Sequence, residues 1–83
     1  MVEVIFSVHP ESSAPRNVSG QILSKEYGSL SDFELAKIDE MICLQHGEDE
    51  KEISLWKVKN VKRIIRKNKD VYIVSCFFHF EFK

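Results

Sequence analysis

Apolar residues alternate with other residues at both ends of this chain, in the period of a β-strand. At the start the alternating residues are Val2, Val4, Phe6 and Val8. They predict a strand over 2–8 with one apolar face. At the end every second residue from position 72 is apolar, namely Tyr72, Val74, Cys76, Phe78, Phe80 and Phe82. This second row predicts a strand whose apolar side chains all face the core.

The middle of the chain has a different spacing, which is typical of one buried face of an α-helix. The apolar residues that carry it are Leu35, Ile38, Met41 and Ile42. Ser31 and Glu34 have the spacing of a capping box at a helix start. Gly47 suits the left-handed position that follows a helix end. The sequence therefore predicts a helix over 32–46.

Two further strands are expected between these elements. A short one falls over 18–27, where Gly20 interrupts the apolar residues. A longer one falls over 52–66, where the alternation changes phase and a β-bulge near Asn60 would restore it. Residues 67–70, Lys-Asn-Lys-Asp, supply the turn to the last strand, because asparagine tolerates positive φ.

The register of this last hairpin stays open at the level of sequence. A two-residue loop at 68–69 would place Ile65 opposite Tyr72. The same register would put Arg63 on the core side, which is an unfavourable place for an unpaired cation.

Together these elements give the order β-β-α-β-β in one domain over residues 1–83. A chain of 83 residues has room for one small core. We therefore expect an α+β fold, a four-stranded sheet with one helix packed on one face. The second face of the sheet would be open to solvent or to a partner. The element order is also compatible with a β-grasp arrangement.

Charge is strongly segregated, although the net charge is only −1. Residues 32–52 contain eight acidic residues against two lysines. Residues 57–69, which we call the basic arm, contain seven basic residues and no acidic one: Lys57, Lys59, Lys62, Arg63, Arg66, Lys67 and Lys69. This asymmetry indicates steering toward a charged partner rather than a particular fold.

The candidate partner-binding residues lie on this arm and on the strand that follows it. They are Lys57, Lys59, Lys62, Arg63, Arg66, Lys67, Phe77 and His79. The cations could dock an acidic protein or contact nucleic-acid phosphates, with the aromatic residues stacking on bases. They could also be a solvated strand whose lysines limit aggregation. If exposed, Phe77 beside Phe82 would form an apolar interface patch.

No catalytic or metal-binding motif is present. The chain has no GxSxG, P-loop or HExxH sequence, and its histidines and cysteines do not have zinc-ligand spacing. We therefore expect no metal and no cofactor. A binding protein is a better interpretation of this sequence than an enzyme. Cys43 and Cys76 are expected to be reduced, although a bridge between them stays open. A secretory signal and a membrane-spanning run are absent, which predicts a cytoplasmic protein without membrane contact.

One resemblance adds an alternative. The segment VKRIIRKNKDVYIVSCFFHF, residues 61–80, resembles the C-terminal hairpin of the RelE/ParE toxin superfamily, and VEVIFS, residues 2–7, is similar to its first strand. The resemblance implies a ribonuclease toxin. Arg63 and Arg66 would hold RNA phosphate and His79 would shuttle a proton.

The leading expectation is a small intracellular binding or inhibitor module that acts on a protein partner through a charged sheet face. Its size and lack of a catalytic motif are typical of inhibitors and adaptors encoded by phages and mobile elements. The alternatives are the RelE-like toxin and a nucleic-acid-binding domain that uses the basic arm. A homodimer that extends the sheet is a further expectation.

Overall fold

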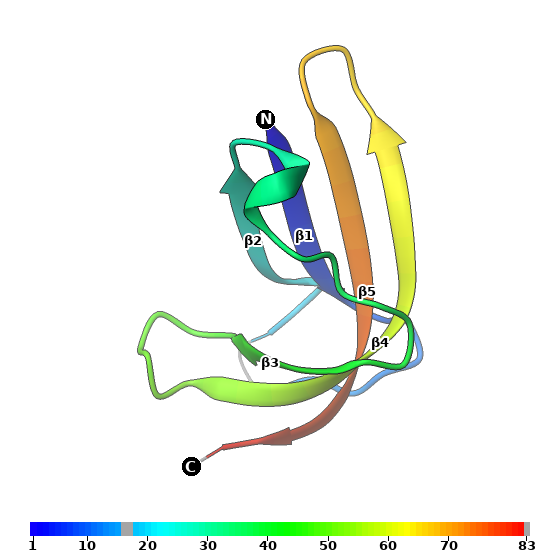
Figure 1. Ribbon diagram of the computed structural model, residues 1–83. Coiled ribbons are helices and arrows are strands. Elements are labelled where there is room, and N and C mark those ends of the chain that lie inside the picture. The colour runs from blue at the N-terminus through cyan, green and yellow to red at the C-terminus, as the bar shows by residue number, and fades with distance from the viewer. Residues whose placement is uncertain (16–17, 83) are drawn as a thin grey trace.

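The computed structural model describes residues 1–15 and 18–82, and its regular structure in these residues is almost entirely β-sheet (Figure 1). The five strands are β1 (Val2–Val8), β2 (Gln21–Tyr27), β3 (Met41–Gln45), β4 (Ile53–Ile65) and β5 (Asp70–Glu81). A single 3-10 turn, η1 (Leu30–Asp32), follows β2. No helix among the described residues is long and apolar enough to cross a bilayer.

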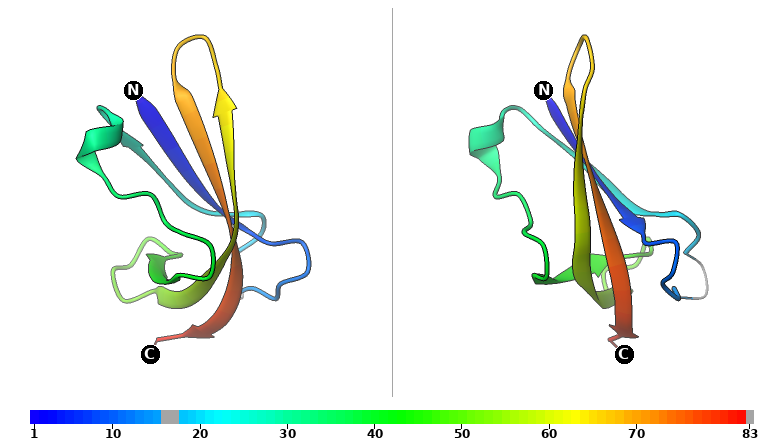
Figure 2. Two further views of the ribbon diagram at one scale, coloured as in Figure 1. Left: turned by 45° about the vertical axis from the view of Figure 1, so that its right-hand side comes forward. Right: turned by 90° about the vertical axis from the view of Figure 1, so that its right-hand side faces the viewer.

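The strands form one mixed sheet in the order β2-β1-β5-β4-β3. β1 runs parallel to β5, while the other neighbouring strands are antiparallel. Figures 1 and 2 show the sheet curling, with β3 and the adjoining halves of β4 and β5 bending across the lower part of the molecule. The curl brings the two edge strands, β2 and β3, toward each other. It gives the sheet a concave inner face and a convex outer face.

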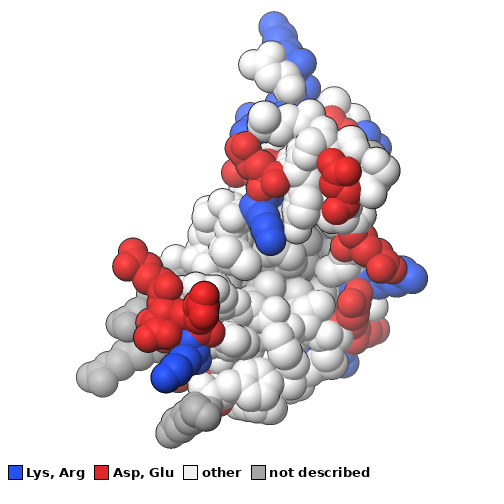
Figure 3. All heavy atoms as spheres, turned by 60° about the vertical axis from the view of Figure 1, so that its left-hand side comes forward, with Lys and Arg blue, Asp and Glu red and all other residues white. Residues whose placement is uncertain are grey.

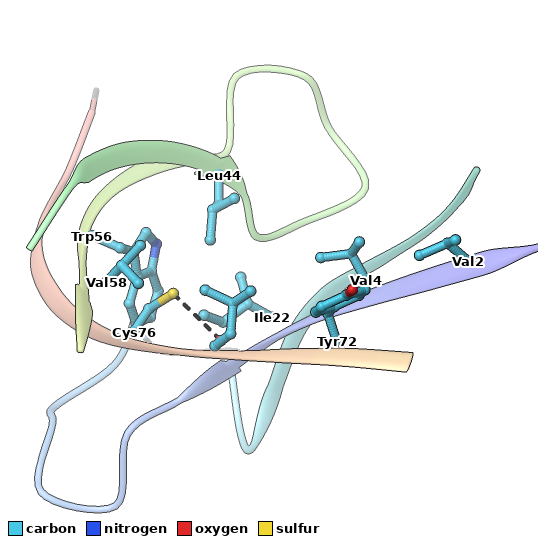
Figure 4. Packing of buried hydrophobic residues seen from close by; sticks show 9 residues of the cluster. Val2, Val4, Ile22, Leu44, Trp56, Val58, Tyr72 and Cys76 are labelled. Carbon is cyan, nitrogen blue, oxygen red and sulfur yellow. Dashed lines mark hydrogen bonds between the residues drawn. The ribbon is translucent and has the colours of Figure 1, made fainter. Parts of the chain in front are cut away.

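The core fills the inner face. Alternation along each strand points one set of side chains inward, and the buried apolar residues are Val2, Val4, Ile22, Leu44, Trp56, Val58, Tyr72, Val74 and Cys76. Figure 4 shows Trp56, Val58 and Cys76 together at one end of this cluster, with Leu44 reaching in from β3. Because these residues come from all five strands, the curled sheet supplies both walls of its own core.

The expected α+β class is wrong, because residues 32–46 do not form a helix. Residues 33–40 have no regular structure and residues 41–45 are β3. The helical spacing does not mark one buried face, since Ile38 is 61% exposed and Met41 is 43% exposed. Ile42 and Leu44 instead alternate inward, opposite Trp56 and Ser54 of β4. Pairing with β4 therefore determines the conformation of this segment.

The capping box predicted from Ser31 and Glu34 is wrong, because the cap of the single turn η1 is formed by Ser29 and Asp32 instead. The Ser29 N–H donates to Asp32 Oδ2 at 3.0 Å, and the Asp32 N–H donates to Ser29 O at 3.2 Å. Phe33 then has an extended backbone, with φ −152°. Further on, Val58 N–H donates to Glu40 O at 2.9 Å, which extends the β3–β4 ladder backwards. The helical structure in this segment is therefore limited to one turn, and strand pairing begins at Glu40.

The predictions for the first two strands and for the bulge agree with the structure. β1 has the predicted bounds, and β2 begins three residues into the predicted 18–27 segment. The predicted bulge near Asn60 is confirmed by a register shift between Val58 and Asn60. The register that was open in the sequence is now defined: a loop at 68–69 is wrong, because Ile65 pairs with Asp70 and Arg66 N–H donates to Lys69 O.

A second irregularity near the end of β5 changes which aromatic residues are buried. Trp56 pairs with Phe78 and Leu55 pairs with Phe80, so His79 is an extra residue on β5. An extra residue reverses the alternation. Phe80 therefore lies with Leu55 on the outer face and is 50% exposed, while Phe82 is 44% exposed. The predicted core-facing row is right as far as Phe78 and wrong for Phe80 and Phe82.

Candidate functional site

The structure distributes the eight predicted site residues over several places. Lys57, Lys59, Lys62 and Phe77 belong to the outer face, since they alternate with buried residues of β4 and β5. The remaining predicted residues are Arg63 on the inner face, Arg66 and Lys67 in the loop 66–69, and His79 at the β5 bulge. The predicted site residues therefore do not form the single charged sheet face that the sequence predicts. They are divided between the two faces of the sheet, the hairpin loop and the β5 bulge.

The densest grouping surrounds Phe77. Lys59 places its Nζ 5.7 Å from the centroid of the Phe77 ring, a cation–π arrangement. The His9 ring lies 6.0 Å from the Phe77 ring, and Lys57 is the register partner of Phe77 on β4. Ser12 Oγ accepts a 2.7 Å hydrogen bond from the Phe78 N–H, which fixes the loop after β1 beside β5. Three separate segments thus converge on one aromatic ring.

Two more aromatic rings continue this surface. Phe80 and Phe82 lie 5.1 Å apart, centroid to centroid, at an interplanar angle of 68°. Leu55 lies opposite Phe80 on the same outer face. We call Phe77, Phe80, Phe82 and Leu55 the aromatic patch. Sequence reasoning included Phe77 and Phe82 but missed Phe80, because a strict alternation places it in the core.

Several cations of the basic arm are neutralised by carboxylates. Lys57 Nζ lies 3.8 Å from Asp39 Oδ1, and Arg63 donates to Asp70 Oδ2 at 2.7 Å. The hydrogen bond to Asp70 raises the pKa of Arg63, and its guanidinium also lies 5.9 Å from the centroid of the Tyr72 ring. In the sequence, Arg63 on the core side was expected to be an unpaired cation. The structure gives this cation a partner, Asp70.

Lys69 is neutralised in the same way at the end of the hairpin. Its Nζ lies 2.9 Å from Glu3 Oε1 and 3.6 Å from Glu26 Oε1. The hydrogen bond to Glu3 raises the pKa of Lys69. Among the described residues, the arm cations without an ion pair are Lys59, Lys62, Arg66 and Lys67.

The ribonuclease alternative requires groups that this structure keeps apart. Arg63 pairs with Tyr72, which is seven residues from His79 along β5. At about 3.3 Å per residue this corresponds to a separation of roughly 20 Å along the strand. Arg63 and His79 therefore do not surround one phosphate. The RelE/ParE resemblance itself stays a prediction.

The acidic residues form a group of their own. Glu48, Asp49, Glu50 and Glu52 belong to the connection between β3 and β4. Figure 3 shows one group of acidic side chains low on the molecule, others higher up, and basic side chains at the tip of the β4–β5 hairpin. The two charged regions are thus presented on different parts of the surface.

The two cysteines differ in environment and are not joined. Cys43 is exposed on β3 and Cys76 is buried in the core. Burial raises the pKa of Cys76 to about 12. Within residues 1–15 and 18–82, no group of three His, Cys, Asp or Glu side chains is placed to hold a metal ion.

A cleft of about 210 Å³ opens on the inner side, between β1, β3 and the segment 33–36. Its walls are mainly apolar and include Phe6, Tyr27, Phe33, Leu35 and Ile42. The Tyr27 and Phe33 rings stack at 4.3 Å and close one side. Two acidic residues, Glu34 and Glu40, also line the cleft.

Comparison of the chain with protein-family models, curated proteins and solved structures gave no match.

Proposed function

We propose that this chain is a small, non-enzymatic binding module that docks on a protein partner through the aromatic patch and the lysines beside it. The observation that carries the proposal is the exposure of Phe80 and Phe82, which are 50% and 44% exposed and pack against each other. Adjacent exposed aromatic rings on a small protein are typical of an interaction surface.

The surroundings of the patch indicate the chemistry of the partner. Lys57 and Lys59 lie at its border, on the same outer face as Phe77. Interfaces commonly have an apolar aromatic centre and a polar rim. A partner with an apolar pocket and acidic residues around it would match both parts, and its charge would speed the encounter.

A protein partner fits these features better than a nucleic acid. Nucleic-acid binding draws its affinity from several phosphate contacts. Here Lys62, Arg66 and Lys67 lie farther along the hairpin from the exposed rings, so few cations lie beside the rings. The net charge of −1 also gives no general attraction to phosphates.

The test is affinity capture with a tagged chain from a lysate of the source cells, with and without nuclease. The informative variant is Phe80→Ser with Phe82→Ser. The matched control is Ile38→Ser with Ile65→Ser, which removes two exposed apolar residues, 61% and 72% exposed, outside the aromatic patch.

The proposal is supported if the wild type and the control variant both capture one protein that nuclease does not release. The Phe80/Phe82 variant must fail to capture that protein. The proposal fails if the Phe80/Phe82 variant retains the same proteins as the wild type. It also fails if everything captured is released by nuclease, since that pattern indicates a nucleic acid.

A further inference from the structure

One side of β4 is open along half its length. β3 pairs with Ile53–Lys57, and Glu40 extends the pairing to Val58. From Asn60 to Ile65, β4 pairs with β5 on one side and with no other described strand. Figures 1 and 2 show this part of β4 at the margin of the sheet beside β5, with the loop 66–69 projecting beyond it. We call residues 60–65 the open edge.

The hydrogen-bond pattern shows which main-chain groups this edge presents. The Arg66 N–H donates to Lys69 O at 3.0 Å, across the hairpin loop. Bonded and non-bonded pairs alternate along an antiparallel ladder. The N–H and C=O groups of Val61, Arg63 and Ile65 therefore point away from β5. They are oriented to pair with an added strand.

The side chains along the open edge carry positive charge on both faces. Lys62 pairs with Ile73 on the outer face, and Arg63 pairs with Tyr72 on the inner face. Lys59 and Arg66 flank the two ends. Arg63 is paired with Asp70 of β5, whereas Lys59, Lys62 and Arg66 have no ion pair among the described residues. A strand added here meets an excess of cations.

This charge selects the occupant. Two copies of the edge paired with each other would bring like charges into opposition, which is destabilising. Acidic side chains on an added strand would instead face Lys62 on the outer face, which has no ion pair among the described residues. Exposed Ile65, at 72%, and half-buried Val61 give such a strand an apolar contact on the inner face.

The other two sheet edges are less accessible. β2 and β3 approach each other as the sheet curls, and the segment 33–36 lies beside them over the cleft. The open edge of β4 has no such neighbour among the described residues.

We propose that residues 60–65 of β4 bind an extended acidic segment of a partner protein as an added β-strand. Main-chain pairing to Val61, Arg63 and Ile65 requires an extended segment. The cations give the site its preference for Asp and Glu side chains in that segment. This site uses no residue of the aromatic patch, so it stands or falls independently of the proposed function above.

The probe is a synthetic acetylated peptide of alternating glutamate and valine, titrated into the isotope-labelled chain and followed by amide NMR. We expect the amide signals of Val61, Arg63 and Ile65 to shift and to become slower in hydrogen exchange. A lysine–valine peptide should not bind. A glutamate–valine peptide methylated on every main-chain nitrogen should bind at least about tenfold more weakly, as expected for loss of roughly 1.4 kcal/mol.

Two charge-reversal variants distinguish attraction of the acidic peptide to the open edge from its attraction to the overall charge of the chain. Lys62→Glu should weaken binding of the acidic peptide by about tenfold or more. Lys25→Glu makes the same change of net charge on exposed β2 and should leave the affinity within about twofold of wild type. Phe80→Ser with Phe82→Ser should also leave it unchanged, which separates this site from the aromatic patch.

The proposal is overturned if the acidic peptide does not bind at millimolar concentration, or if the shifted amides lie elsewhere. It is also overturned if both charge reversals weaken binding equally, if the methylated peptide binds as well as the unmethylated one, or if the chain alone dimerises through residues 60–65.

Discussion

The indole N–H of Trp56 donates a hydrogen bond to Ser54 Oγ at 2.7 Å, and both side chains are completely buried. The two residues are two apart on β4, so both point to the inner face. His46 Nδ1 lies 2.9 Å from the same hydroxyl. Ser54 is thus a polar residue in an apolar core because it satisfies the donor of the largest core side chain.

Replacing Ser54 with alanine should destabilise the fold by about 1–3 kcal/mol, the cost of leaving a buried donor without a partner. Ser24→Ala is the control, because Ser24 is exposed on β2 and should change stability by less than about 0.5 kcal/mol. Urea denaturation followed by tryptophan fluorescence measures both. Equal stability of the two variants would show that Trp56 finds another acceptor.

The cysteines provide a second prediction, based on reactivity. At pH 8 iodoacetamide should modify Cys43 in the folded chain and leave Cys76 unmodified, because Cys43 is exposed and Cys76 is buried with a raised pKa. Mass spectrometry should show one adduct per native chain and two after denaturation. Rapid modification of both thiols in the native state would contradict the buried position of Cys76.

Alkaline pH should weaken the fold through the same thiol. Burial raises the pKa of Cys76 from 9.0 to about 12, so above pH 9 the unfolded chain releases a proton that the folded chain retains. The unfolding free energy therefore falls as the pH rises from 9 toward 12. Cys76→Ala should lack this part of the dependence, so its stability deficit against wild type should shrink over this range. A constant deficit would contradict the assignment.

The sequence was sufficient where local pattern and tertiary pairing agree. β1 follows its alternation, and the phase change within 52–66 correctly predicts the bulge near Asn60. It was insufficient for 32–46, where a capping pattern and helical spacing compete with pairing to β4. That competition is decided by β4, which is distant in sequence, and local periodicity carries no information about it.

The candidate site was predictable in composition but not in arrangement. The cations and Phe77 are visible in the sequence, yet their division between faces depends on the bulges at Lys59 and His79. One inserted residue on either strand moves every later side chain to the opposite face. The neutralising carboxylates, such as Asp39 for Lys57, also come from segments that only the fold brings near.

A fourth prediction concerns the connection between β1 and β2. Gly20 has φ +76°, and its carbonyl accepts the Val8 N–H at 2.7 Å. No atom lies within 4 Å of an added Cβ, so only backbone strain opposes a side chain. Gly20→Ala should cost about 1–2 kcal/mol. Gly20→Asn should cost less, because asparagine tolerates this conformation. Thermal unfolding compares the two, and equal stability of wild type and both variants would contradict the strained turn.

The last prediction tests the bulge that exposes the end of β5. Phe78 packs on the core with its ring 5.2 Å from that of Trp56, whereas Phe80 is 50% exposed on the opposite face. Phe78→Ala should therefore destabilise the fold by about 3 kcal/mol, the cost of removing a packed aromatic ring. Phe80→Ala should cost less than about 1 kcal/mol.

Chemical denaturation of the two variants under identical conditions measures this difference. A continuous alternation without the extra residue at His79 would place both rings in the core and make both substitutions costly. Similar large losses for Phe78→Ala and Phe80→Ala would therefore contradict the bulge and remove the aromatic patch as a surface. The predicted inequality would establish that Phe80 is held outside the core, on the surface that the proposed function requires.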